Sequence, residues 1–148
     1  MFNKKFIKLD KKIESKEDLF KYIARKLYQY NRIDNEDNFI NALNEREKEI
    51  STGIGNHIAI PHTKDATILK PTVFYVRLSE MIEYKSLDQK PVKHVFLIGM
   101  PANYFNEHLK VLAKISKLLL VEDNINFLNE SNNIEEIYKL VNKYLGDN

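Results

Sequence analysis

A chain of 148 residues is long enough for one domain with a substantial hydrophobic core. Its 23 basic and 21 acidic residues are interspersed, so no basic block marks a nucleic-acid interface. The absence of cysteine excludes disulfides and thiolate nucleophiles. No segment has the apolar core of a signal peptide or the roughly 18 apolar residues of a membrane span. We therefore expect one cytoplasmic domain over residues 1–148.

The first third of the sequence predicts a strand followed by two helices. Residues 6–10 (FIKLD) alternate in polarity, as a strand does. Ser15 precedes Asp18 by three residues, which is typical of a helix N-terminus. The apolar residues at helical spacing that should face the core are Leu19, Phe20, Ile23, Ala24 and Leu27. A second helix is predicted from about Asn35 to Glu49, with Phe39, Ile40 and Leu43 on its apolar face.

Two further strands and two further helices follow. Residues 71–78 (PTVFYVRL) and 94–100 (HVFLIGM) are rich in β-branched and aromatic residues, and the second is apolar enough for a central strand. The turn-forming segment between them, residues 83–92, should be a loop. A helix is predicted from about Asn103 to Leu120, with Phe105, Leu109, Leu112 and Leu119 at helical spacing.

The last predicted helix runs from about Ile134 to Leu145. Asn133 is its expected N-cap, and Gly146 its expected stop. Strands and helices therefore alternate along the whole sequence. This pattern predicts an α/β domain in which helices cover a sheet.

The segment from Arg46 to Lys64 (REKEISTGIGNHIAIPHTK) contains the most informative histidine. Pro61 interrupts the apolar strand just before His62, so the imidazole should emerge at a strand end. An imidazole with an ordinary pKa near 6.5 is largely neutral at pH 7 and carries a lone pair that can attack phosphorus. A structural histidine is the alternative interpretation.

The other candidate residues leave several functions unsupported. No serine lies in a G-x-S-x-G elbow, so a hydrolytic triad is not predicted. His57 and His62 are five positions apart and no H-E-x-x-H pattern occurs, so we predict neither a metal site nor a cofactor. His108 shares a helical face with apolar residues and should point inward, either as a core histidine or as a second imidazole in a site. The neighbours on that face are Leu112, Ile115 and Leu119.

Residues 51–55 (STGIG) form either a phosphate-binding turn or an ordinary glycine turn. Arg46, just before them, could bind phosphate oxygens with two parallel hydrogen bonds. Within the charged run EREKE, however, both Arg46 and Glu47 would ordinarily be solvated.

Two blocks of the sequence resemble one family, the enzyme IIA domain of the phosphoenolpyruvate-dependent sugar phosphotransferase system, fructose/mannitol type. The first is residues 46–62 (REKEISTGIGNHIAIPH), and the second is residues 86–119, which begin SLDQKPVKHVFLIGM. The resemblance implies an α/β sandwich with a mixed β-sheet flanked by helices. It also implies that His62 accepts the phosphoryl group, that His108 is a second active-site histidine, and that Arg46 supports the phosphate.

By the same resemblance, the carrier protein HPr would phosphorylate His62, which would pass the group to enzyme IIB without metal or cofactor. Association with the membrane would be indirect, through the IIC component. Ile54 and Ile58 are candidates for the docking surface. The sugar is not readable, because enzyme IIA does not contact it.

Two alternatives use a similar motif. A regulatory enzyme IIA of the nitrogen-related kind would act through phosphorylation-dependent protein binding. An output domain of a transcriptional antiterminator is disfavoured, because no helix-turn-helix or RNA-binding segment precedes the motif.

His57 stands where the family usually has glycine. That implies either a positive φ or a close approach to a partner. Strand alternation would turn His57 away from His62, so we expect it at the rim of the site.

Overall fold

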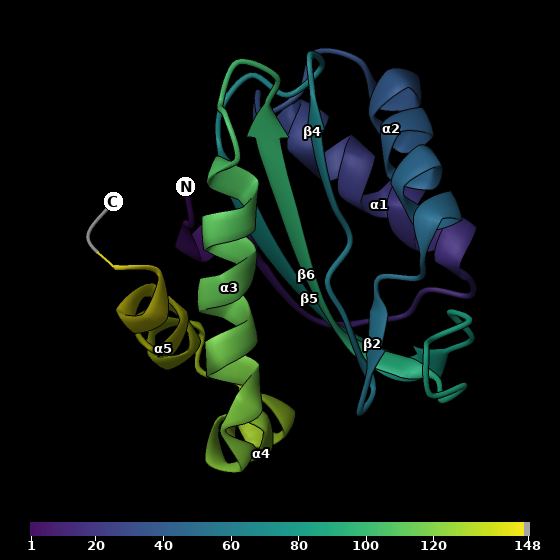
Figure 1. Cartoon of the computed structure of the whole chain (residues 1–148). Helices are drawn as coiled ribbons and strands as arrows, with labels where there is room; N and C mark the ends of the chain where they lie inside the picture. Colours follow the sequence, from purple (N-terminus) through teal and green to yellow (C-terminus); the bar gives the residue numbers. More distant parts are fainter. Residues whose placement is uncertain (147–148) are drawn as a thin grey trace.

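Six strands form one mixed sheet at the centre of the computed structural model, which describes residues 1–146 (Figure 1). The order across the sheet is β1-β5-β6-β3-β2, and β4 also pairs with β6. β5 and β6 are antiparallel, whereas β1 runs parallel to β5, and β3 and β4 run parallel to β6. The strands are β1 (Ile7–Lys11), β2 (Gly53–Gly55), β3 (Ile58–Ala59), β4 (His62–Asp65), β5 (Thr72–Ile82) and β6 (Val92–Pro101).

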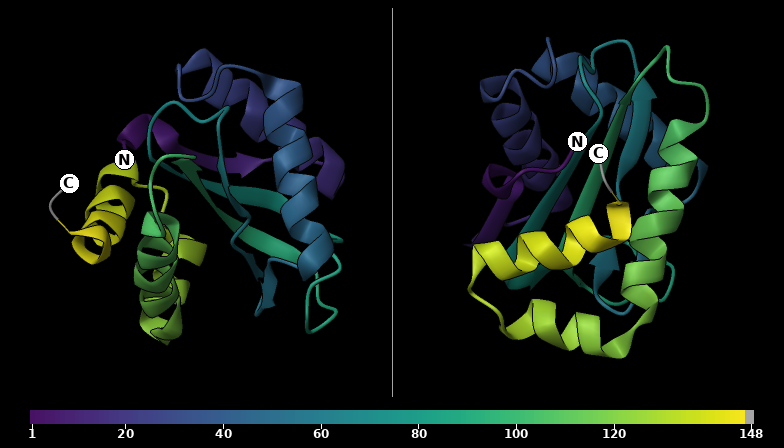
Figure 2. Two further views of the ribbon diagram at one scale, coloured as in Figure 1. Left: turned by 45° about the horizontal axis from the view of Figure 1, so that its top comes forward. Right: turned by 90° about the vertical axis from the view of Figure 1, so that its left-hand side faces the viewer.

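Helices cover both faces of this sheet (Figure 2). The first face carries α1 (Lys16–Gln29) and α2 (Glu36–Glu49), and the second carries α3 (Glu107–Leu120), α4 (Glu122–Glu130) and α5 (Ile134–Leu145). A short 3-10 helix, Lys4–Phe6, precedes β1. The predicted α/β sandwich with a mixed sheet flanked by helices is therefore confirmed. Within residues 1–146, no helix combines the length and the hydrophobicity needed to cross a membrane.

The strands at the centre of the sheet are buried on both faces. Along β5, Phe74 and Val76 join the core beneath α1 and α2, whereas Val73 and Tyr75 join the core beneath α3, α4 and α5. Side chains alternate between the two faces of a strand, so a strand covered on both sides must be apolar throughout. β6 has the same character, which confirms its prediction as a central strand.

Capping side chains begin the helices where the sequence predicts. The Ser15 hydroxyl accepts a hydrogen bond from the Asp18 N–H at 3.1 Å, and the Asn133 side chain accepts one from the Glu136 N–H at 3.1 Å. Each cap satisfies a backbone donor that the first helical turn leaves unpaired, typically stabilising the helix by about 1 kcal/mol. The five apolar residues predicted to face inward from α1 are all buried.

The prediction for α3 is wrong in its start and partly wrong in its buried face. The helix begins at Glu107 rather than near residue 103, after Asn106 in a left-handed conformation with φ 55°. Phe105 lies outside the helix and is 81% exposed, and Leu109 is 50% exposed. The residues buried against the sheet are Val111, Ile115 and Leu118. Apolar residues surround much of this helix, so periodicity fits more than one orientation.

Two elements differ from the prediction: β5 is longer than expected, and α4 is an additional helix. β5 continues to Ile82, four residues past the predicted end at Leu78. Helix α4 was not predicted, because its N-cap residue, Val121, makes no side-chain capping bond and the helix buries only Leu128 among its own residues. Both the start signal and the apolar stripe of a typical helix are therefore weak.

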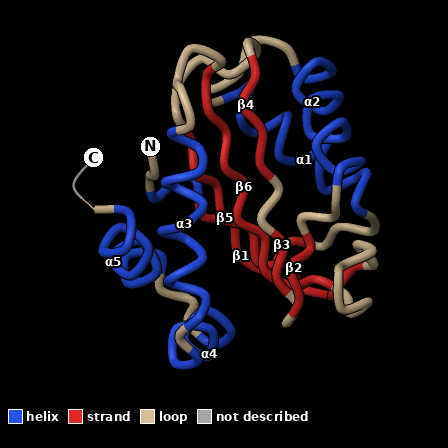
Figure 3. The backbone as a smooth tube through the Cα atoms, viewed as in Figure 1, coloured by secondary structure: helices blue, strands red, loops and turns tan. Residues whose placement is uncertain are grey.

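β3 and β4 lie end to end along β6 (Figure 3). β3 pairs with β6 at His94 and Val95, and β4 pairs with it from Ile98 onward. Pro61 separates them, because proline has no N–H to donate to a strand. The interruption predicted at Pro61 is thus observed, and His62 is the first residue of β4.

Two buried polar side chains tie the second helical layer to the sheet. Arg77 donates to both carboxylate oxygens of Asp10 at 3.0 Å and to the Leu128 carbonyl at 3.0 Å. His94 lies between the Tyr75 hydroxyl, 2.8 Å from Nδ1, and the Asn129 side-chain oxygen, 2.6 Å from Nε2. Burial lowers the pKa of His94 to about 4, so its ring is neutral at pH 7.

Candidate functional site

His62 lies at the first position of β4, where helices α2 and α3 approach the sheet. Its side chain faces a groove of about 600 Å³ and is nearly buried, with 8% of the residue exposed. The groove is lined by Ala42, Glu45, Arg46, Glu49, His62, Thr63, Lys64, Asp65, His108, Leu109 and Leu112. The three predicted site residues, from α2, β4 and α3, therefore share one groove.

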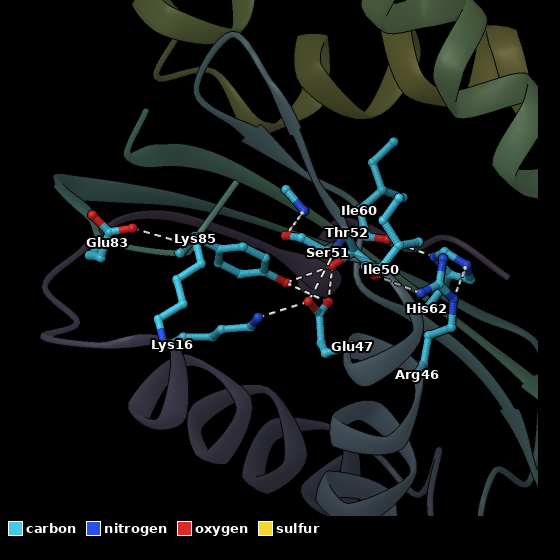
Figure 4. Close-up of polar contacts among 12 residues, drawn as sticks. Lys16, Arg46, Glu47, Ile50, Ser51, Thr52, Ile60, His62, Glu83 and Lys85 are labelled. Atoms are coloured by element: carbon cyan, nitrogen blue, oxygen red, sulfur yellow. Dashed lines mark hydrogen bonds and ion pairs between the residues drawn. The ribbon is translucent and has the colours of Figure 1, made fainter. Parts of the chain in front are cut away.

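Hydrogen bonds define the tautomer of His62. Nδ1 lies 2.7 Å from the Ile60 carbonyl oxygen, so Nδ1 carries the proton and donates it. Nε2 accepts a hydrogen bond from the Arg46 Nε–H at 3.2 Å (Figure 4). A lone pair therefore resides on Nε2, the nitrogen that faces an arginine.

Burial lowers the pKa of His62. The hydrogen bond to Ile60 raises the pKa, and the positive charge of Arg46 lowers it further. Because lowering dominates, the ring is neutral at pH 7 and its Nε2 lone pair is available to an electrophile.

Arg46 is placed by the end of α2. Its Nη1 donates to the Ile50 carbonyl at 2.8 Å, which satisfies a carbonyl just beyond the last turn of the helix. A guanidinium has several N–H donors in a fixed plane, so these two bonds leave others for an anion. Such an anion would lie beside His62 Nε2.

His108, the second residue of α3, presents a half-buried ring to the same groove. Burial lowers its pKa, and the charges of His62 and Lys64 lower it further. Its Nδ1 is buried and has no hydrogen-bond partner within residues 1–146. A buried polar atom without a partner is costly, and a ligand in the groove could satisfy it. The ring therefore lines the groove rather than sitting in the core.

Glu47 differs most from its prediction. Its side chain is only 8% exposed, so the expectation of a solvated residue is wrong. The carboxylate receives hydrogen bonds from Lys16, Thr52 and Tyr84, which come from three separate segments. A run such as EREKE carries no local signal of these contacts, because the partners are distant in sequence.

The segment STGIG is part of a hairpin rather than a phosphate-binding turn. Gly53 pairs with Ala59, and Gly55 pairs with Ile58. At Gly53 an added Cβ would lie 2.9 Å from the Ser86 Cα, so only glycine fits against that loop. The glycines therefore serve close packing and a tight turn.

His57 occupies the turn of this hairpin with φ 66°, the left-handed conformation anticipated from the glycine usual at this position. Its Nδ1 donates to the Pro91 carbonyl at 2.9 Å. The side chain thus braces the turn against the loop before β6 and does not line the groove of His62.

The two apolar residues proposed for docking, Ile54 and Ile58, differ in their exposure. Ile54 is exposed, whereas Ile58 is buried in the core beneath α3 and is not available to a partner.

A second, larger cavity of about 1000 Å³ lies beside Arg32, Lys70 and Phe105. It contains no histidine, and we place the chemistry in the smaller groove because a neutral imidazole, an arginine and a second histidine meet there. Residues 1–146 contain no group of three or more His, Cys, Asp or Glu side chains suited to a metal ion.

The fold and this groove define an α/β domain in which a histidine on a short strand lies beside an arginine. Residues 1–144 match the family described as "Phosphoenolpyruvate-dependent sugar phosphotransferase system, EIIA 2". The chain belongs to this family of phosphoryl-carrier domains.

Individual relatives agree with the family match. The fructose-specific EIIA component of Haloferax volcanii is 37% identical over 117 residues, covering 79% of this chain and 76% of that protein. The fructose-specific EIIABC component of Mycoplasma pneumoniae is 38% identical over 132 residues, which are 89% of this chain but 18% of that longer protein. Among solved structures, the nitrogen regulatory protein IIA-Ntr of Neisseria meningitidis superimposes with a TM-score of 0.88, at 28% identity and 95% coverage of both chains.

Proposed function

We propose that this protein is a histidine phosphocarrier in which His62 Nε2 receives a phosphoryl group from phospho-HPr and passes it to an enzyme IIB partner. The observation that carries the proposal is the state of the His62 ring. Its proton is held on Nδ1 by the Ile60 carbonyl, and its Nε2 lone pair faces Arg46.

In the transfer, the P–N bond to the donor imidazole breaks as a P–N bond to His62 Nε2 forms. No proton needs to move, because the Nδ1–H stays in its bond to the Ile60 carbonyl. The phosphorylated ring then carries a positive charge, which that carbonyl stabilises. The charge also keeps the ring a good leaving group for the next transfer, in which enzyme IIB takes the phosphoryl group.

Arg46 has two successive tasks in this scheme. In the free protein the Arg46 Nε–H donates a hydrogen bond to the lone pair of His62 Nε2 at 3.2 Å. Once phosphorus takes that lone pair, the guanidinium faces the phosphoryl oxygens, where the charge of the transition state is spread. His108, from the opposite helical layer, supplies a second donor to those oxygens.

The partners follow from the family and from the relatives. The name EIIABC of the Mycoplasma pneumoniae relative joins an A component to B and C components. This supports an enzyme IIB as the acceptor and indirect association with a membrane IIC component. HPr as the donor rests on the family resemblance alone.

A regulatory role is the second candidate, because the structurally similar Neisseria meningitidis protein is a nitrogen regulatory IIA. The groove would accept a phosphoryl group in either role. In the regulatory role the phosphorylated protein would bind a target without passing the group to enzyme IIB.

Intact-mass spectrometry tests the phosphorylation site. The protein is incubated with phosphoenolpyruvate, enzyme I and HPr, and His62→Ala is compared with wild type. The matched control is His57→Ala, which removes a histidine outside the groove. We expect one acid-labile phosphoryl group on wild type and control and none on His62→Ala. Persistent phosphorylation of His62→Ala would refute the assignment.

Adding a fructose-type enzyme IIB to the phosphorylated protein separates the two roles. Rapid transfer of the phosphoryl group supports the transport role. Retention of the group, with phosphorylation-dependent binding to another protein, supports the regulatory one.

A further inference from the structure

The carboxylate of Glu47 is surrounded by hydrogen-bond donors. Oε2 lies 2.7 Å from Lys16 Nζ and 3.2 Å from the Thr52 N–H (Figure 4). Oε1 accepts from the Thr52 hydroxyl and, at 3.2 Å, from the Tyr84 hydroxyl. Burial raises the pKa of Tyr84 well above its ordinary value, and the charge of Glu47 adds to this, so the phenol stays a protonated donor.

A carboxylate suits these partners because both of its oxygens accept hydrogen bonds. An amide would keep only one acceptor oxygen and would lose the ion pair with Lys16. The carboxylate is nearly buried, and a buried charge is tolerated only where it is paired and hydrogen-bonded, as here.

The segment held by Glu47 supports both residues of the proposed transfer. The Thr52 carbonyl accepts from the Ile60 N–H at 2.9 Å, and the Ile60 carbonyl in turn accepts from His62 Nδ1 at 2.7 Å. This chain of bonds connects the carboxylate to the atom that fixes the tautomer of His62.

Arg46 depends on the same segment by a second route. It immediately precedes Glu47 in α2, and its Nη1 donates to the Ile50 carbonyl at 2.8 Å. Ile50 lies two residues before Thr52, and both the backbone N–H and the hydroxyl of Thr52 donate to the Glu47 carboxylate. A shift of residues 50–52 would therefore move Arg46 as well as Ile60.

We infer that Glu47 is a positioning residue for phosphoryl transfer: its carboxylate fixes residues 50–52, and these orient the Ile60 carbonyl toward His62 Nδ1 and hold Arg46 at His62 Nε2. This inference rests on the proposed function of His62. Glu47 itself contacts neither the imidazole nor the incoming group.

The test is Glu47→Gln, observed in two ways. Nitrogen chemical shifts of the unphosphorylated His62 ring report which nitrogen carries the proton. We expect wild type to show a protonated Nδ1 and Glu47→Gln to show exchange between the two tautomers. The rate constant for phosphoryl acceptance from saturating phospho-HPr should fall about 10- to 100-fold, since small displacements of reacting groups cost about that much. The KM for phospho-HPr should change little, because the groove surface is retained.

Glu49→Gln is the matched comparison. The charges of Glu47 and Glu49 both raise the pKa of His62, so either variant should lower it. Glu49 is exposed, and it makes no hydrogen bond to residues 50–52 among those that the structure describes. We therefore expect Glu49→Gln to keep the Nδ1–H tautomer. Equal tautomer changes in both variants would show that charge alone acts, and would overturn the inference.

Thr52→Val keeps the test decisive if Glu47→Gln does not fold. It removes one donor to the carboxylate while preserving the shape of the side chain and the backbone bonds. It should shift the tautomer and the rate in the same direction as Glu47→Gln, by a smaller factor. A folded Thr52→Val with the wild-type tautomer and rate would overturn the inference. The tautomer is measured without any phosphoryl donor, so failure here is distinguishable from failure of the phosphocarrier proposal.

Discussion

Protonation of His94 should destabilise the protein as the pH falls below neutrality. The ring is 1% exposed and lies in the sheet, with Nδ1 accepting from the Tyr75 hydroxyl and Nε2 donating to Asn129. A protonated ring would carry a donor at both nitrogens and would lose the bond that Tyr75 donates. In the unfolded chain the same ring is free to bind a proton.

The pKa of His94 sets the size of this effect. This pKa falls from 6.5 to about 4 on folding. Once the ring is protonated in both states, the difference lowers the free energy of unfolding by about 3 kcal/mol. Between these two pH values the unfolded chain binds more protons than the folded one. The free energy of unfolding therefore decreases as the pH falls from about 6.5 to about 4. Above about 6.5 the ring is neutral in both the folded and the unfolded chain, so its protonation costs no stability.

Urea denaturation of wild type and His94→Gln at about pH 7.5 and about pH 5 measures this contribution. The variant should be less stable at both pH values, because it loses buried hydrogen bonds. Its free energy of unfolding should, however, fall less than that of wild type on acidification, by about 2 kcal/mol. Burial lowers the pKa of His62 and of His108 in both proteins, so their contributions cancel in the comparison. Equal pH dependence in wild type and variant would refute the assignment to His94.

Two further predictions concern the groove and the hairpin turn at His57. Arg46→Ala and His108→Ala should each slow phosphoryl acceptance by about 10²- to 10³-fold in rapid-quench experiments while leaving the fold intact, since each removes a prepositioned donor; wild-type rates would contradict their proposed roles. His57→Gly relieves a left-handed φ of 66° but loses the bond to the Pro91 carbonyl, so the free energy of unfolding should change by less than about 1 kcal/mol. Phosphorylation should stay within a few-fold of wild type, and a folded His57→Gly that accepts no phosphate would place His57 in the site.

The helices that the sequence predicts well begin with local signals. Ser15, Asn35 and Asn133 each cap a helix by accepting a hydrogen bond from an N–H three residues later. Such contacts are determined within one turn, so they can be read from a few neighbouring residues. Helix α4 has neither a side-chain cap nor a broad apolar stripe, so the sequence does not predict it. The buried face of α3 depends on how the helix lies on the sheet, which periodicity does not specify.

In the candidate site, too, some residues are predictable from the sequence and others are revealed only by tertiary contacts. His62, Arg46 and His108 are predicted as site residues because two sequence blocks resemble a family, and the structure brings them to one groove. The supporting role of Glu47 was not found, since its partners Lys16 and Tyr84 lie in α1 and after β5. A local run of charged residues is ordinarily solvated, and only tertiary contacts reveal the exception.

The groove is a product of the whole fold rather than of one segment. Arg46 comes from the helical layer on one face of the sheet, His108 comes from the layer on the other face, and His62 lies on the short strand between them. The break at Pro61 matters here, because the Ile60 carbonyl lies in the gap between β3 and β4 and accepts from His62 Nδ1. A substitution that shifts one helical layer should therefore change the distance from His62 to Arg46 or to His108.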